Sequence, residues 1–144
     1  MPRKKSTNPR PPERDYSHRS LLDKLGVKPG HRVAVLGVED AEFLRDLAAR
    51  VSGFAKDLVS GSPGAFDLIF LAAESKPDLL RVKSLAGKIQ KAGAVWVVYP
   101  KGQSHIREAD VFAAGKGAGM TDNKVARFSE THTALRFVIP VARR

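Results

Sequence analysis

Acidic, basic and aromatic residues directly follow the three apolar runs that read as buried strands, RVAVLG, FDLIFLA and AVWVVY. In an open parallel sheet, ligands bind outside the carboxyl ends of the strands, where such loops meet. The tip of the predicted C-terminal hairpin reaches the same edge. The residues that we expect to gather there and to form a ligand-binding site are Gly37, Glu39, Asp40, Glu74, Tyr99, Lys101, Glu130 and His132.

The carboxylates and the histidine of this set offer different chemistry. Glu39 and Glu74 can hold an amine or a metal, although solvated loop carboxylates are the more common state of such residues. Asp40 precedes a helical pattern, which favours the role of helix N-cap over that of ligand contact. His132 and Glu130 can form a proton-transfer pair, because histidine titrates near neutral pH. An exposed hairpin tip accounts for that pair equally well.

The segment Tyr99–Lys101 offers a different kind of contact. Lys101 follows a buried strand and a rigid proline, so its ammonium group can meet a phosphate or a carboxylate. Tyr99 adds an aromatic face for stacking. The alternative is an ordinary strand exit. The sequence therefore leaves an anion-binding role and a structural role open here.

Two other motifs do not support a site. The run Gly115–Gly119 resembles a phosphate loop, but it follows a predicted helix, where glycine serves to end the helix. His18, His31 and His105 lack the spacing of metal ligands, and the chain has no cysteine. We therefore predict no metal site, no disulfide and no thiol chemistry.

The formal net charge of +10 favours an anionic partner. Residues 1–20 hold six basic and two acidic residues and so carry +4 of this charge. Residues 1–16 are rich in proline and charge, so we expect a disordered tail ahead of a single domain over 17–144. Such a tail either solubilises the chain or makes weak nonspecific contacts with nucleic acid. The basic residues that would contact phosphates are Arg3, Lys4, Lys5 and Arg10.

The length of 144 residues fits one domain, and no apolar run approaches the roughly 20 residues that a membrane span requires. The first 20 residues lack the apolar core of a signal peptide, so we expect a cytoplasmic location. The pattern predicts helices over 18–26, 40–53, 75–93 and 107–118, and strands over 32–37, 54–59, 66–72, 94–99, 124–128 and 134–139. This alternation indicates an α/β fold with a mostly parallel sheet covered on both faces and a C-terminal antiparallel hairpin.

This order resembles a class I methyltransferase that has lost part of its first half, over residues 21–140. The segments LLDKLGVKPGHRVAVLG, GAVWVVYPKG and MTDNKVARFSETHTALRFV resemble more closely a family of short bacterial proteins of unknown function with Rossmann-like folds. The methyltransferase resemblance implies S-adenosylmethionine as a cofactor and a reversal of strand order between segments 32–37 and 66–72.

The chain departs from working methyltransferases at the positions that bind this cofactor. Those enzymes carry a second glycine in the loop after the first strand, and Glu39 stands at that position here. The carboxylate that holds the ribose has only Asp57 as a counterpart. Only about thirty residues separate Gly37 from Asp67, so the substrate-shaping elements look trimmed.

Three functions remain open from the sequence. The first is a non-catalytic or minimally catalytic domain that binds a small anionic ligand or a protein partner. The second is an S-adenosylmethionine-dependent methyltransferase, because methyl transfer can proceed chiefly by positioning. The third is an accessory nucleic-acid-binding protein that acts through the basic tail.

Overall fold

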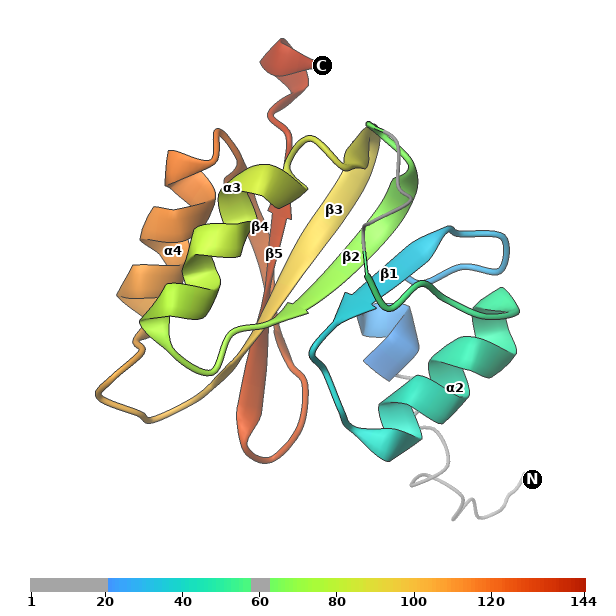
Figure 1. The fold of residues 1–144 in the computed structure, drawn as a ribbon, viewed down its shortest axis with the longest axis horizontal. Helices are drawn as coiled ribbons and strands as arrows, with labels where there is room; N and C mark the ends of the chain where they lie inside the picture. The colour runs from blue at the N-terminus through green and yellow to red at the C-terminus, as the bar shows by residue number, and fades with distance from the viewer. Residues whose placement is uncertain (1–20, 58–62) are drawn as a thin grey trace, which may run out of the picture.

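The computed structural model describes residues 21–57 and 63–144, and the predicted tail over 1–16 lies outside them. A central sheet carries helices on both faces (Figure 1). Residues 21–24 form a helical turn ahead of the first strand. The further elements are β1 (Val33–Leu36), α2 (Ala41–Val51), β2 (Phe66–Ala72), the 3-10 helix η1 (Lys76–Arg81), α3 (Val82–Leu85), β3 (Ile89–Pro100), α4 (Glu108–Gly117), β4 (Thr121–Arg127), β5 (His132–Val138) and the 3-10 helix η2 (Val141–Arg143).

The sheet is mixed, with the strand order β1-β2-β3-β5-β4. The pairings of β1 with β2 and of β2 with β3 are parallel. The last strand, β5, lies between β3 and β4 and pairs antiparallel with both. The predicted hairpin is present, but it inserts its second strand into the sheet. The expectation of a mostly parallel sheet therefore holds in part: among the described strands, β1, β2, β3 and β4 run in one direction and β5 runs against them.

Of the predicted strand over 54–59, the described part, 54–57, forms a single bridge, and positions 58 and 59 lie outside the described residues. Ala55 pairs with Ala34 in parallel on the side of β1 away from β2. Its carbonyl accepts from Val35 N at 2.8 Å, and its amide donates to Val33 O at 2.9 Å. After β1, the chain therefore first pairs with one edge of β1 at Ala55, and β2 then pairs with the opposite edge of β1. The strand order reverses between β1 and β2, as the resemblance implied.

The predicted helix over 75–93 ends at Leu85, because residues 86–88 form a turn and β3 begins at Ile89. Ile89 is spaced as a helical residue, but it pairs with Phe66 of β2. Gly93, expected to end the helix, lies at an irregularity inside β3. A Cβ atom at this glycine would lie 2.7 Å from the Asp67 carbonyl oxygen, so the close approach of two backbones explains the glycine.

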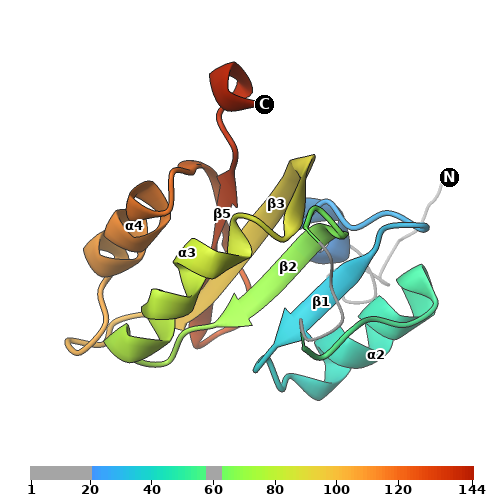
Figure 2. The same ribbon diagram turned by 45° about the horizontal axis from the view of Figure 1, so that its top comes forward.

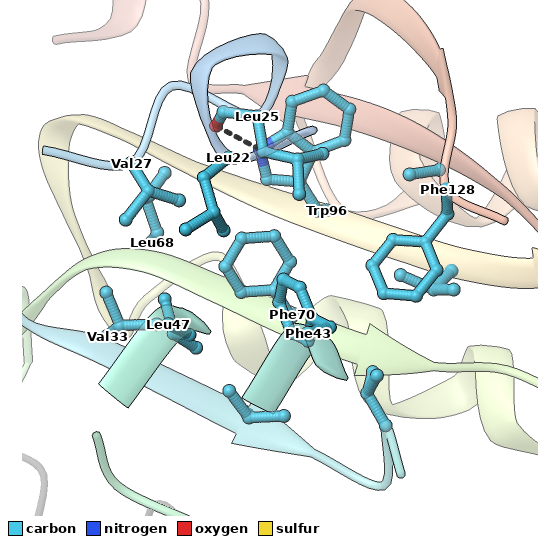
Figure 3. Packing of buried hydrophobic residues seen from close by; sticks show 14 of the residues in the cluster. Leu22, Leu25, Val27, Val33, Phe43, Leu47, Leu68, Phe70, Trp96 and Phe128 are labelled. Carbon is cyan, nitrogen blue, oxygen red and sulfur yellow. Dashed lines mark hydrogen bonds between the residues drawn. The ribbon is translucent and has the colours of Figure 1, made fainter. Parts of the chain in front are cut away.

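One core lies between the sheet and the elements α2 and 21–25 (Figure 3). Phe43 of α2 meets Phe70 edge-on at a centroid distance of 5.2 Å and Phe128 at 4.9 Å. Trp96 is fully buried, and its Nε1 donates to the Leu25 carbonyl at 3.0 Å. This bond satisfies the indole N–H and attaches the helical turn to the middle of the sheet.

The second core lies on the other face, under η1, α3 and α4 (Figure 2). Phe137 of β5 is buried there against Gly115 of α4. A Cβ atom at Gly115 would overlap the Phe137 ring, so this glycine permits the close packing of helix on strand. Within 21–57 and 63–144, no helix is long and apolar enough to cross a membrane.

We predict that Gly115→Ala lowers the free energy of unfolding by about 1–3 kcal/mol, the usual cost of inserting a methyl group into a packed core. Gly117→Ala is the matched control, since a Cβ atom there meets nothing within 4 Å. It is expected to change stability by less than about 1 kcal/mol. Urea unfolding of both variants measures the difference, and equal midpoints would contradict the packing role of Gly115.

Candidate functional site

A crevice of about 350 Å³ opens at the carboxyl ends of β1, β2 and β3. Its volume falls within the range of about 300–1,000 Å³ that is usual for small-molecule pockets. It lies where the strand order reverses, which is the position predicted for ligands. The residues that line it are Gly37, Val38, Glu39, Asp40, Ala72, Glu74, Val98, Phe128, Ser129, Thr131 and His132.

The structure brings five of the eight predicted residues together in this crevice: Gly37, Glu39, Asp40, Glu74 and His132. An adjoining hollow of about 430 Å³ shares Asp40, Phe128 and Ser129 with the crevice and is also lined by Glu130.

Gly37 turns the chain out of β1 toward α2. Its φ of +85° lies in the left-handed region, which favours glycine. A Cβ atom here would lie 3.4 Å from the Cβ of Ala72, so conformation rather than space restricts this position. Three residues later, Asp40 Oδ1 accepts from Phe43 N at 3.0 Å. The predicted N-cap role of Asp40 is confirmed, and one of its oxygens is committed to α2.

His132 pairs with Glu74. The Nε2 atom of His132 lies 2.8 Å from Glu74 Oε2, and its Nδ1 atom lies 2.8 Å from Thr131 Oγ1. The pairing of His132 with Pro100 brings the hairpin to the end of β3, beside the loop that leaves β2. The sequence suggested Glu130 as the partner of His132, but Glu130 lies on the adjoining hollow.

The contacts of His132 fix the tautomer of its neutral form. An ionised Glu74 can only accept, so Nε2 of His132 carries the proton and donates it. Nδ1 is then an acceptor, and the Thr131 hydroxyl donates to it. The result is a carboxylate–imidazole–hydroxyl relay on the wall of the crevice. The side chain of Glu74 is 60% exposed and that of His132 only 26%, so the imidazole is the better protected member.

Sequence reasoning missed Thr131 and Ser129. The Ser129 hydroxyl accepts from the backbone N–H groups of Thr131 and His132 at 3.3 and 3.2 Å. This turn orders the hairpin tip and aims His132 at Glu74. The adjacency of Ser, Thr and His in SETHT was the available signal, since short hydroxyl side chains commonly cap such turns.

Tyr99 and Lys101 do not join the crevice. They line a separate open hollow of about 600 Å³ beside the start of α4. Successive side chains of β3 point to opposite faces, so Val98 enters the crevice while Tyr99 packs in the core under α4. Burial and the neighbouring Glu108 raise the pKa of Tyr99 to about 12, and its hydroxyl donates to Glu108 at 3.4 Å. The anion-binding role of this segment stays a prediction.

Among the residues that the structure describes, three carboxylates and one histidine, but no lysine or arginine, line the crevice. The local charge is therefore opposite in sign to the net charge of the chain. A cationic or hydroxyl-bearing group is favoured there over an anion. Among residues 21–57 and 63–144, no group of three or more potential ligands is arranged to hold a metal ion.

Neither a protein-family description nor any curated protein matches the sequence. Solved structures do match the fold. An S-adenosylmethionine-dependent methyltransferase from Aquifex aeolicus superposes with a TM-score of 0.69 at 13% identity, over 85% of this chain and 89% of that protein. Magnesium protoporphyrin IX methyltransferase from Synechocystis PCC 6803, with bound S-adenosylhomocysteine, gives 0.62 at 12% identity, over 94% and 90%.

The cyclase SpnF is also similar, with a TM-score of 0.60 at 11% identity over 88% of this chain and 82% of that protein. The same architecture therefore supports more than one chemistry, and similarity at this level of identity establishes the fold alone. The chain has a Rossmann-like α/β fold of the class I S-adenosylmethionine-dependent methyltransferase type, built on a mixed five-stranded sheet.

Proposed function

We propose that the crevice binds an S-adenosyl ligand and that the protein is a minimally catalytic or non-catalytic binding domain. The observation that carries this proposal is an acidic crevice at the point where the strand order reverses. Gly37, with its positive φ, forms the turn from β1 into this crevice. Ligands of folds with this sheet bind at that point. The solved structures that share the fold include proteins described as binding S-adenosylmethionine or S-adenosylhomocysteine.

The charge of the crevice supports this ligand over the small anion expected from the sequence. S-adenosylmethionine carries a positive sulfonium and a positive ammonium group. Glu39 and Glu74 line the crevice, and no lysine or arginine of residues 21–57 and 63–144 lines it with them. Charge-assisted hydrogen bonds from an ammonium group to such carboxylates are among the stronger polar contacts. A phosphate would meet repulsion at the same position.

The residues fit one end of this ligand better than the other. Gly37 and the carboxylates suit the amino-acid and sulfonium end. The ribose end is less well provided. Glu39 takes the place of a second glycine, and Asp57, two residues after the Ala55 bridge, does not line the crevice. We therefore expect modest affinity, with Glu39 or Glu74 as the main polar contact.

The short connection from β1 to β2 supports a limited catalytic role. In the part that the structure describes, this connection holds α2 and the single bridge at Ala55. Few residues are available there to enclose a second substrate. Excluding water and fixing a near-attack geometry supply much of the rate in positioning catalysis. The described part of this connection is therefore better suited to binding a ligand than to fast turnover.

We predict that S-adenosylmethionine raises the melting temperature of the full chain by several degrees at about 100 times its dissociation constant, equivalent to about 2.7 kcal/mol. S-adenosylhomocysteine lacks the sulfonium charge, so it is expected to bind equally or less tightly. Adenosine monophosphate, which is anionic, is expected to bind more weakly still. Tighter binding of adenosine monophosphate would overturn the assignment of a cationic ligand.

We predict that Glu39→Gln and Glu74→Gln together weaken S-adenosylmethionine binding by at least about tenfold, the loss of one charge-assisted hydrogen bond. Asp122→Asn is the control for a lost carboxylate, because it removes one negative charge from the exposed strand β4, where the double variant removes two from the crevice. Isothermal titration calorimetry compares the affinities. If the double variant binds as tightly as the control variant, the ligand does not occupy this crevice.

A second candidate function, methyl transfer, is favoured by the relay of Glu74, His132 and Thr131. S-adenosylmethionine, when bound, would supply an electrophilic methyl group. An acceptor hydroxyl or amine must lose a proton as it is methylated. Thr131 Oγ1 can take this proton while its own passes to His132 Nδ1, and Glu74 stabilises the imidazolium that results. The acceptor would be a small molecule with an exchangeable proton.

We predict that His132→Asn lowers any methyl transfer by at least about a hundredfold, the usual contribution of a general base, while S-adenosylmethionine affinity stays within about twofold. The assay follows label from methyl-labelled S-adenosylmethionine into a panel of small hydroxyl and amine acceptors. Transfer that is unchanged in the variant would exclude the relay. If S-adenosylmethionine binds but no acceptor is methylated, the methyl-transfer proposal is wrong and only the binding function is supported.

A further inference from the structure

Arg136 occupies an unusual position on the inner face of β5. It lies between Ala134 and Val138, which are buried in the core beneath α2 and the 21–25 turn. Across the sheet it is in register with Trp96 of β3 and Lys124 of β4. An apolar side chain is the ordinary choice for such a position. A partly buried guanidinium therefore calls for a partner that compensates its charge.

The described residues provide Arg136 with a neutral partner instead of an acid. Its Nη1 donates to Asn123 Oδ1 at 3.4 Å. Within 21–57 and 63–144, no carboxylate forms an ion pair with Arg136, Arg144 or Lys124. Burial, together with the nearby charge of Arg144, lowers the pKa of Arg136. Arg144 Nε bonds to the carbonyl of Ile139, three residues beyond Arg136, so both guanidinium groups belong to the same end of β5, and no described carboxylate forms an ion pair with either.

The other members of this cluster are held by backbone carbonyls. Arg144 Nε donates to Ile139 O at 2.9 Å, and Lys124 Nζ donates to Lys24 O at 2.8 Å. These bonds fix the stems of both side chains and leave further N–H groups to donate. The amide nitrogen of Asn123 also stays available, because its oxygen accepts from Arg136. Arg136, Arg144, Lys124 and the amide of Asn123 therefore supply several positioned hydrogen-bond donors on this part of the surface.

We propose that Arg136, Arg144 and Asn123 form a binding site for a phosphate group. Guanidinium groups bind phosphate oxygens in paired, nearly parallel hydrogen bonds, and one phosphate can neutralise two of them. The site lies toward the Val138 end of β5, where the chain continues to its C-terminus, and this end is opposite the hairpin tip and the crevice (Figure 1). It is therefore separate from the proposed S-adenosyl site, and failure of either proposal leaves the other standing.

The phosphate belongs either to a small ion or to the backbone of a nucleic acid, and two probes distinguish these sources. The full chain is titrated with inorganic phosphate and with a labelled single-stranded oligothymidylate. We expect Arg136→Gln and Arg144→Gln each to weaken binding of at least one probe by at least about tenfold, as for a lost charge-assisted contact. With the oligonucleotide, each variant is also expected to reduce the slope of log affinity against log salt by about 0.7.

Arg81→Gln is the matched control, because it removes one exposed positive charge from η1 on the other face of the sheet. Arg136→Met tests the alternative that the stem of Arg136 only covers the core. A structural role predicts that the methionine variant is as stable as the parent and binds both probes unchanged. That result, or equal losses in Arg136→Gln and Arg81→Gln, would overturn the phosphate site. Arg144→Gln keeps the test valid if the variants at position 136 do not fold.

Discussion

The parallel pairing of β1 with β2 brings the two loops that supply Gly37, Glu39, Asp40 and Glu74 to one edge of the sheet, and the rest of the crevice is built against them. Val33 is in register with Leu68, and Leu36 with Leu71, so both strands end at the same edge of the sheet. Gly37 and Glu74 then leave that edge from neighbouring strands. A shift of this pairing by one residue would turn the side chains of one strand to the opposite face. The buried residues on both faces of β2 resist such a shift, and the crevice inherits its geometry from the core.

Local patterns predicted the parts of the fold that depend on local physics. The bounds of β2 and the cap at Asp40 follow from an apolar run and from one short polar side chain ahead of a helix. The prediction that residues 86–93 continue the helix was wrong, because Ile89 fits both the spacing of a helix and a place in a strand. Its pairing with Phe66 decides between them. That contact joins residues that are distant in the sequence, and no local pattern contains it.

The candidate site shows the same division. The edge of the sheet on which the loops meet follows from the order of strands and helices, so five of the expected residues lie together. Tyr99 and Lys101 lie elsewhere because the two-residue alternation of β3 turns Tyr99 to the other face. The partner of His132 is 58 residues away in the sequence, and only the position of β5 beside β3 reveals it. Net charge was a poor guide here, since a strongly basic chain encloses an acidic crevice.

The contact between Glu74 and His132 also bears on how the protein is made. A chain that emerges from the ribosome exposes residues 37–74 long before the hairpin that supplies Ser129, Thr131 and His132. The parallel pairs of β1, β2 and β3 can form first, but one wall of the crevice then stays open until the last strands are added. A nascent or C-terminally truncated chain therefore holds an incomplete crevice. A small molecule that binds the crevice therefore stabilises the folded state of full-length chains and not that of truncated chains.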